Sequence, residues 1–160
     1  MLIGVVSDTH GHVGQAQTAV RMLESLDVEL VLHCGDIGST EIVPLFAPWE
    51  THFVFGNVDH DEAALRKAIE LSGGTCHGRF GSLVREGRRM AMLHGDDAAR
   101  FRRETTSGQW DLVCYGHTHV AAMRYEGDTL VLNPGALYRA RPHSLAVVEL
   151  SRMKATVVEV

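Results

Sequence analysis

The chain opens with the sequence MLIGVVSDTHG, residues 1–11, in which a short apolar run is followed at once by polar residues and glycine. The run Leu2–Val6 is rich in β-branched side chains and predicts a buried strand. The polar residues after it predict a loop at the carboxyl end of that strand, carrying Asp8 and His10. This unit of strand and polar loop is the pattern from which we infer the fold.

The same unit recurs along the first half of the chain. Apolar runs at 28–33 and 51–55 lead to Asp36 and Asn57, respectively. Between the first two runs, apolar residues spaced by three and four over residues 16–26 predict a helix. This alternation of strand and helix predicts a parallel sheet with right-handed crossovers.

Two more helices are expected around the third strand. Ser39 is a candidate N-cap for a short helix over residues 40–46. Asp61 is a candidate N-cap for a helix that continues to Glu70 and stops at the glycines 73–74.

The second half of the chain has a different pattern. Apolar runs at 90–93 and 112–115 lie on either side of a polar, helical stretch over 97–107. After His119 only strands and turns are expected, which suggests an antiparallel meander. The expected strands of this meander lie at residues 120–125, 129–132, 145–150 and 155–160. We therefore expect residues 1–160 to form a single α/β domain of two stacked sheets with helices outside.

The composition excludes several classes of protein. The chain has 160 residues and a net charge of −5, which argues against an extended nucleic-acid partner. No apolar run approaches the ~20 residues of a membrane helix, and the start lacks the basic segment of a secretory signal. The three cysteines lie far apart and predict no disulfide scaffold. We expect a cytoplasmic protein with no membrane partner.

Polar residues that can bind metal gather at the predicted strand ends. In open α/β sheets, ligands bind just beyond the carboxyl ends of the strands. Seven residues occupy such positions after five candidate strands: Asp8, His10, Asp36, Asn57, His94, His117 and His119. Scattered surface residues would not follow strand ends so regularly, so we interpret the seven as one site.

The spacing within this set suggests two metal ions. In extended backbone, Asp8 and His10 would point the same way, ~6.6 Å apart. His117 and His119 have the same spacing and could offer one imidazole to each of two ions ~3.5–4 Å apart. The donors are carboxylate, imidazole and amide groups without thiolate, which favours a catalytic site for Mn, Fe, Ni, Co or Zn over a structural zinc site.

Glycine precedes two of the candidate ligands. Gly35 comes before Asp36, and Gly56 comes before Asn57. Glycine permits a positive φ or a close approach of the backbone, and we expect one or the other at both positions.

These motifs together resemble a known family. The motifs are D-T-H at 8–10, G-D at 35–36, G-N-V-D at 56–59, H-G at 94–95, G-H-T-H at 116–119 and N-P-G at 133–135. In this order they resemble the calcineurin-like metallophosphoesterases, and most closely the small bacterial and archaeal phosphodiesterases that are YfcE-like. The resemblance covers most of the chain.

The resemblance implies a fold and a metal centre. The fold is the metallophosphoesterase fold, a four-layer sandwich of two mixed β-sheets flanked by helices. The centre holds two divalent transition-metal ions, of which manganese is expected and nickel, cobalt, iron or zinc are alternatives. By motif, Asp8, His10, Asp36 and His119 would hold the first ion, and Asp36, Asn57, His94 and His117 the second.

The resemblance also implies a mechanism, in which a hydroxide that bridges the ions attacks phosphorus in line with the leaving oxygen. The residues expected to take part in catalysis are Asp36, Asn57, His94, His117 and Asp59. Many family members carry a histidine after G-N, where this chain has Val58. The general acid therefore stays open between His60, a water molecule and none. Asp59 is expected to orient a ligand histidine as a hydrogen-bond acceptor.

Three functions remain open at this point. The first is a phosphodiesterase that acts on a small phosphate ester, because the short loops between motifs leave the site open. The second is a phosphomonoesterase or nucleotidase that uses the same site. The third is a non-catalytic protein-binding scaffold, as in a eukaryotic retromer subunit that resembles this family. Exposed sheet edges also make a homodimer an expectation.

Three residues near the motifs have two interpretations each. His33 lies within an apolar run and is either a core histidine or a support for a ligand. Arg139 and Arg141 follow N-P-G and are either solvated charges or a clamp for a phosphate oxygen.

Overall fold

The computed structural model describes all of residues 1–160 and contains two mixed sheets. The first sheet has the strand order β11 (Lys154–Glu159), β10 (Ser144–Glu149), β1 (Leu2–Val6), β2 (Leu30–Cys34), β3 (Glu50–Val54) and β4 (Thr75–Cys76). The second has the order β5 (Phe80–Arg85), β6 (Arg88–Leu93), β7 (Leu112–Cys114), β9 (Thr129–Asn133) and β8 (Ala122–Glu126). The helices are α1 (Val13–Ser25), the 3-10 helix η1 (Val43–Phe46), α2 (Glu62–Leu71) and α3 (Ala98–Thr106).

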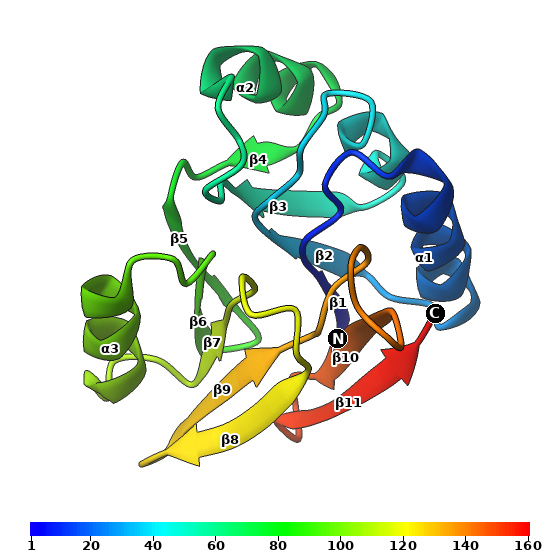
Figure 1. Cartoon of the computed structure of the whole chain (residues 1–160). Coiled ribbons are helices and arrows are strands. Elements are labelled where there is room, and N and C mark those ends of the chain that lie inside the picture. Colours follow the sequence, from blue (N-terminus) through cyan, green and yellow to red (C-terminus); the bar gives the residue numbers. More distant parts are fainter.

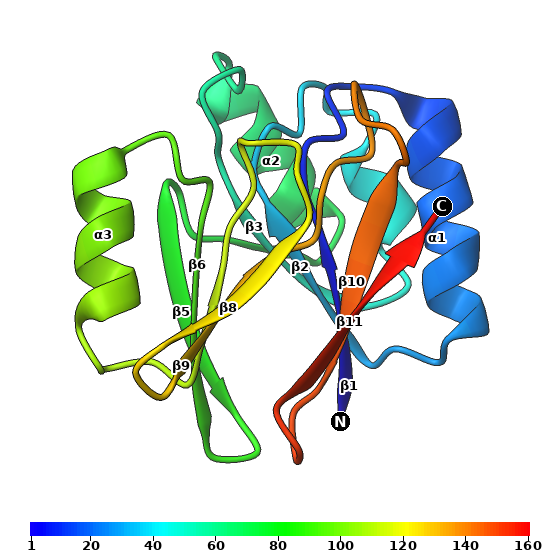
Figure 2. The same ribbon diagram turned by 60° about the horizontal axis from the view of Figure 1, so that its bottom comes forward.

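The sheets and helices form four layers, which confirms the expected sandwich. Figures 1 and 2 show α1 and α2 outside the first sheet and α3 outside the second. One apolar cluster joins the two sheets and includes Ile3, Leu32, Met92 and Leu132. A second lies between the first sheet and its helices, and a third, smaller one packs with Phe101 of α3. Both faces of each sheet are covered around its central strands, as their apolar runs require.

Parallel pairing at the centre of each sheet positions the functional loops. Strands β1, β2 and β3 are mutually parallel neighbours, and so are β6, β7 and β9 in the second sheet. Because parallel neighbours end at the same edge, the loops after these strands meet on one side of the molecule. None of the helices is long and apolar enough to span a membrane.

Of the two expected helix N-caps, the structure contains one. Asp61 accepts a hydrogen bond from the Ala64 N–H at the start of α2, as expected. Ser39 does not cap a helix: its hydroxyl accepts from the Glu41 N–H, and η1 begins only at Val43. Pro44 lacks an N–H and suits the first turn of η1, which spans only four residues.

The expected meander of four strands is wrong as a single unit. Strands β8 and β9 form a hairpin in the second sheet, whereas β10 and β11 form one in the first. The chain crosses between sheets after β9, because β10 extends the first sheet by antiparallel pairing with β1. Strands β4 and β5 have no counterpart among the expected strands. Strand β4 has only two residues, and the β5 sequence Phe-Gly-Ser-Leu-Val-Arg lacks a regular alternation of apolar and polar residues, although its side chains alternate in burial.

His33 on β2 is a core histidine. Its Nε2 lies 3.1 Å from the Thr9 hydroxyl, and its ring packs on Phe46 and Phe53. Its Nδ1 is buried without a hydrogen-bond partner. Burial lowers the pKa of His33 to about 4, against the opposing effect of the Asp8 carboxylate. The core therefore holds this imidazole in its neutral form.

His33 predicts an acid-sensitive stability. Below a pH of ~6.5, His33 is protonated in the unfolded chain but stays neutral in the folded chain. The contribution of His33 to the free energy of unfolding therefore falls as the pH is lowered, until the pH reaches about 4. The loss amounts to about 3 kcal/mol at most. We expect His33→Phe to remove this part of the pH dependence and to cost less than about 1.5 kcal/mol at pH 7.5. Urea unfolding of the unsubstituted chain and of His33→Phe from pH 7.5 to pH 4 measures this effect. An equal pH dependence of the free energy of unfolding in the two proteins would contradict the role of His33.

Candidate metal centre

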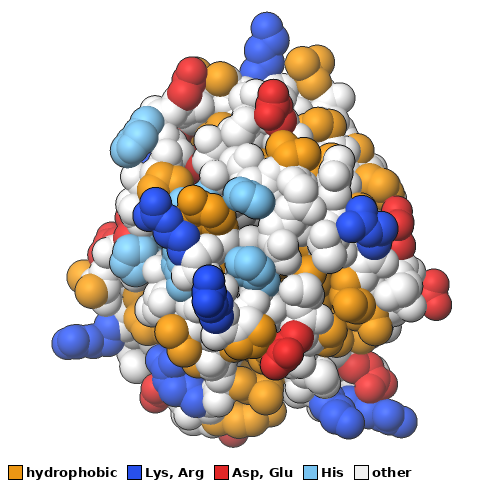
Figure 3. All heavy atoms as spheres, turned by 45° about the vertical axis from the view of Figure 1, so that its right-hand side comes forward, with side chains coloured by type: hydrophobic (Ala, Val, Ile, Leu, Met, Phe, Trp, Pro, Cys, Tyr) orange, Lys and Arg blue, Asp and Glu red, His pale blue; other side chains and the backbone are white.

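The seven candidate ligands all lie in loops just beyond the carboxyl ends of five strands. These are β1 for Asp8 and His10, β2 for Asp36, β3 for Asn57, β6 for His94, and β7 for His117 and His119. Asp8, Asp36 and His94 are buried, whereas Asn57 and His117 are exposed. The space-filling view in Figure 3 shows several histidine side chains gathered on one face of the molecule.

One group of ligands consists of Asp8, His10 and His119. The Nε2 atoms of His10 and His119 are 3.2 Å apart. Oδ1 of Asp8 lies 3.2 Å from Nε2 of His119 and 3.7 Å from Nε2 of His10. The three donor atoms therefore face a common point, in a geometry suited to one cation.

A second group forms around Asn57, His94 and His117. Oδ1 of Asn57 lies 3.1 Å from Nε2 of His94 and 3.1 Å from Nδ1 of His117. The rings of His94 and His117 pack edge to face, with centroids 5.1 Å apart. His117 and His119 thus point to different groups, as their spacing predicted.

Asp36 lies between the two groups. Its Oδ2 is 3.5 Å from Nε2 of His10 and 3.3 Å from Nε2 of His94. Its Oδ1 accepts a hydrogen bond from the Val58 N–H at 3.0 Å, which fixes the orientation of the carboxylate. A single carboxylate oxygen therefore faces a histidine of each group.

The expectation of extended backbone at these motifs is wrong. Nine non-glycine residues have a positive φ, and five of them are candidate ligands. These are Asp8 (57°), His10 (46°), Asp36 (52°), His117 (68°) and His119 (58°). This conformation is unfavourable for residues with a Cβ and persists where the surroundings enforce it, most often at functional sites. The side chains converge because each loop turns sharply, not because the backbone is extended.

The two glycines before ligands have different roles. Gly35 has a φ of 90° and supplies the turn into Asp36. Gly56 instead allows close approach, because a Cβ there would lie 2.1 Å from Oδ1 of Asp36. Gly35 thus supplies the positive φ, and Gly56 the close approach, that were expected of these glycines.

The charges within the site are not balanced by the protein alone. Oδ1 of Asp8 is buried and has no hydrogen-bond partner. Burial acts against ionisation of Asp36, but hydrogen bonds from His94 and Val58 outweigh it and lower the pKa of this carboxyl. Burial likewise acts against protonation of His94, but the Asp36 carboxylate outweighs it and raises the pKa of this imidazole. Two buried carboxylates, one with an orphaned oxygen, fit a site built for cations.

One backbone carbonyl group orients His94 toward the site. Its Nδ1 donates to the carbonyl oxygen of Cys34 at 2.9 Å, so Nε2 faces Asp36 and Asn57. This is the support that a metal-binding imidazole requires from its second nitrogen.

The expectation that Asp59 orients a histidine is wrong. Its buried carboxylate accepts from the backbone N–H groups of Ile37, Gly38 and Gly56, at 3.2, 2.8 and 2.8 Å. It therefore ties the loop after Asp36 to the loop before Asn57. Burial outweighs these three hydrogen bonds and raises the pKa of Asp59.

Asn133 provides a similar support that the sequence motif alone did not explain. Its side-chain amide donates to the Gly116 carbonyl oxygen at 2.8 Å and to the Thr118 hydroxyl at 3.1 Å. It thereby fixes the loop that carries His117 and His119. The N-P-G motif drew attention to Asn133 in the sequence, but it did not indicate which groups the side chain contacts.

Comparison with known proteins shows the family of the chain. Residues 1–153 match the sequence profile of the calcineurin-like phosphoesterase superfamily domain. The chain belongs to this superfamily. A phosphodiesterase of Methanocaldococcus jannaschii is 30% identical over 138 residues, which cover 84% of this chain and 83% of the relative.

Solved structures agree as well. The structure of an archaeal phosphodiesterase superposes with a TM-score of 0.92 at 25% identity, and the match covers 100% of both chains. YfcE, a phosphoesterase of E. coli, shares the fold with a TM-score of 0.66 at 18% identity, and 99% of each chain is covered. This member of the superfamily is thus a phosphoric ester hydrolase related to the small archaeal and bacterial enzymes, and the family implies divalent metal ions.

The contacts of Asp59 predict an effect on metal binding. In Asp59→Asn an amide NH₂ replaces one acceptor oxygen among three N–H donors, so the two loops lose their common anchor. We expect the dissociation constant for Mn²⁺ to rise by about 10- to 100-fold and the free energy of unfolding to fall by about 1–3 kcal/mol. Calorimetric titration and urea unfolding measure these changes. The matched control is Asp61→Asn, since asparagine caps a helix as well as aspartate does; equal metal affinity in both variants would refute the anchoring role.

Proposed function

We propose that this chain is a two-metal phosphodiesterase. The observation that carries the proposal is the position of Asp36, whose Oδ2 lies 3.5 Å from Nε2 of His10 and 3.3 Å from Nε2 of His94. A carboxylate between two groups of nitrogen donors is suited to bridge two ions. In two-metal hydrolases such ions lie ~3.5–4 Å apart.

The contacts suggest which residues would bind each ion. Asp8, His10, Asp36 and His119 would hold the first ion, and Asp36, Asn57, His94 and His117 the second. Asp8 also lies near Asp36 and His94, so the two subsites adjoin. Ions bound there would polarise the phosphate and lower the pKa of a water molecule enough to provide the nucleophile at neutral pH. We propose manganese as the physiological ion, on the basis of this oxygen- and nitrogen-rich donor set.

The Cys34 carbonyl aligns the imidazole of His94 for binding a metal ion. A carbonyl oxygen only accepts hydrogen bonds, so Nδ1 of His94 donates to it at 2.9 Å. Nε2, which lies 3.1 Å from Oδ1 of Asn57, would bind an ion in its unprotonated form, while Nδ1 keeps its hydrogen bond to Cys34.

The charge of the site selects an anionic substrate even though the chain has a net charge of −5. Two divalent ions carry four positive charges, and Asp8 and Asp36 carry two negative ones, so the centre has about two positive charges in excess. The exposed positions of Asn57 and His117 leave this centre open to solvent on one side. An open cationic centre supports a diester, whose phosphate carries groups on two sides.

A metal series with two chromogenic substrates tests the proposed function. With Mn²⁺ we expect the kcat/KM for bis-p-nitrophenyl phosphate to exceed that for p-nitrophenyl phosphate by about tenfold or more, and EDTA to abolish both. The opposite preference would make the chain a monoesterase. A folded protein that binds less than one ion per chain and hydrolyses neither substrate with Mn²⁺, Ni²⁺ or Co²⁺ would instead be a scaffold.

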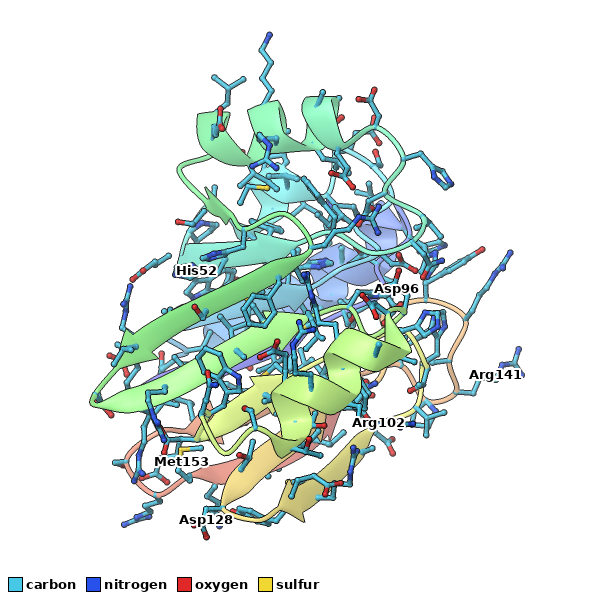
Figure 4. All side chains as sticks on the ribbon, turned by 90° about the vertical axis from the view of Figure 1, so that its left-hand side faces the viewer. His52, Asp96, Arg102, Asp128, Arg141 and Met153 are labelled. Carbon is cyan, nitrogen blue, oxygen red and sulfur yellow. The ribbon has the colours of Figure 1, made fainter.

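The bridging position predicts unequal effects of two isosteric substitutions. Asp36→Asn weakens both subsites, whereas Asp8→Asn removes a charge from the first group of ligands. We expect Asp36→Asn to lower both the bound metal and kcat more than Asp8→Asn does, with a loss in kcat of about 10³-fold or more. Metal analysis and kinetics measure this, with Asp128→Asn in the distant β8–β9 turn as a control (Figure 4). Equal metal content and rates in the two site variants would count against bridging.

A further inference from the structure

A hollow lies beside the first group of ligands, Asp8, His10 and His119. It has a volume of about 610 Å³ and is lined by His12 and by residues of the segment 137–143, among them Tyr138, Arg139, Arg141 and His143. We call it the basic hollow. Its size is within the range of pockets for small molecules. None of these side chains belongs to the predicted metal ligands.

The basic hollow is in direct contact with the metal ligands. The ring of Tyr138 lies 5.5 Å from that of His10, and Nδ1 of His119 donates to the carbonyl oxygen of Arg139 at 3.5 Å. Both histidines belong to the first group. A substrate whose phosphate lies at the metal centre therefore has one side directed at the basic hollow.

The lining of the basic hollow is cationic. It contains two arginines and two histidines and no carboxylate. The guanidinium groups of Arg139 and Arg141 take part in no ion pair and donate no hydrogen bond within the protein, although acidic residues exceed basic ones in this chain. Figure 4 shows Arg141 on a loop at the outer edge of the molecule. Two unpaired guanidinium groups beside a phosphate site are suited to a second anion.

Packing on Tyr138 orders one of these arginines. The Arg139 guanidinium lies 5.3 Å from the centre of the Tyr138 ring, and the His12 ring stacks on the same tyrosine at 5.3 Å. Arg139 also has a φ of 51°, which brings its carbonyl to His119 while its side chain covers the tyrosine. Stacking on an aromatic face limits the freedom of a guanidinium and lowers the entropic cost of binding an anion.

We propose that the basic hollow binds a terminal phosphate on one arm of the diester substrate, through Arg139 and Arg141. The preferred substrate class is then a phosphodiester that carries a second phosphate, such as a 5′-phosphorylated dinucleotide. This inference rests on the proposed phosphodiesterase function, because the scissile phosphate must lie at the metal centre. A guanidinium group can donate two parallel hydrogen bonds to two oxygens of one phosphate. The limited volume of the hollow and its two arginines suit a single phosphate group rather than a nucleic-acid polymer.

Binding to the metal-free protein tests the basic hollow without turnover. The probes are adenosine 5′-monophosphate and adenosine, titrated calorimetrically into the EDTA-treated chain of residues 1–160, whose uncompensated Asp8 and Asp36 repel phosphate. We expect the monophosphate to bind about tenfold more tightly than adenosine, and the variant R139A/R141A to lose that difference. Arg102→Ala, an exposed arginine on α3, is the matched control and should keep it. Equal binding of the two probes, or an unaltered preference in R139A/R141A, would overturn the proposal.

Kinetics on the Mn²⁺-loaded enzyme separates this proposal from the proposed function. We expect the kcat/KM for a 5′-phosphorylated dinucleotide to exceed that for the unphosphorylated dinucleotide by about tenfold, mostly through KM, and R139A/R141A to reduce this ratio toward one. Turnover of both dinucleotides at equal rates would refute the basic hollow and leave the phosphodiesterase intact. If no diester is cleaved, the proposed function fails, and the binding experiment still decides whether the hollow holds a phosphate.

Discussion

The site depends on the burial of two carboxylates, Asp8 and Asp36, in the loops that follow β1 and β2. Buried charge is costly unless it is compensated, and within the protein the compensation is incomplete, since Oδ1 of Asp8 lacks a hydrogen-bond partner. His94 supplies part of the compensation next to Asp36. Burial alone would favour the neutral form of this imidazole, but the Asp36 carboxylate raises its pKa. Cations at this place would complete the compensation, so the stability of the site and its chemistry have the same electrostatic origin.

The geometry around these carboxylates is set by backbone contacts rather than by the ligands themselves. Asp59 joins the loops that follow β2 and β3, Asn133 fixes the loop that follows β7, and the Cys34 carbonyl aligns His94. These supports hold residues in a left-handed conformation that isolated loops would avoid. The strain is distributed over several loops, and the packed sheets beneath keep the loop ends in place.

The surroundings of the metal centre are asymmetric. On the side of the first group, Tyr138 and the segment that follows it form a cationic hollow. On the side of the second group, next to His94, a smaller hollow has acidic and basic residues in equal number, Asp96 and Asp97 with Arg79 and Arg100. An anionic group on a diester would therefore be attracted to the first side more than to the second. This asymmetry supports the substrate orientation that we propose.

The sequence alone determined the ends of the five strands that lead to the site, the helices α1, α2 and α3, and the seven candidate ligands, because hydrophobic runs of the right length and the motifs after them are local properties. It also determined the donor chemistry, which depends only on residue type. Three features required the tertiary structure. The left-handed backbone at Asp8, His10 and Asp36 is enforced by neighbouring loops, and the partners of Asp59 come from two segments far apart in the chain. The split of the last four strands between two sheets was decided by the pairing of β10 with β1, a long-range contact that no local pattern encodes.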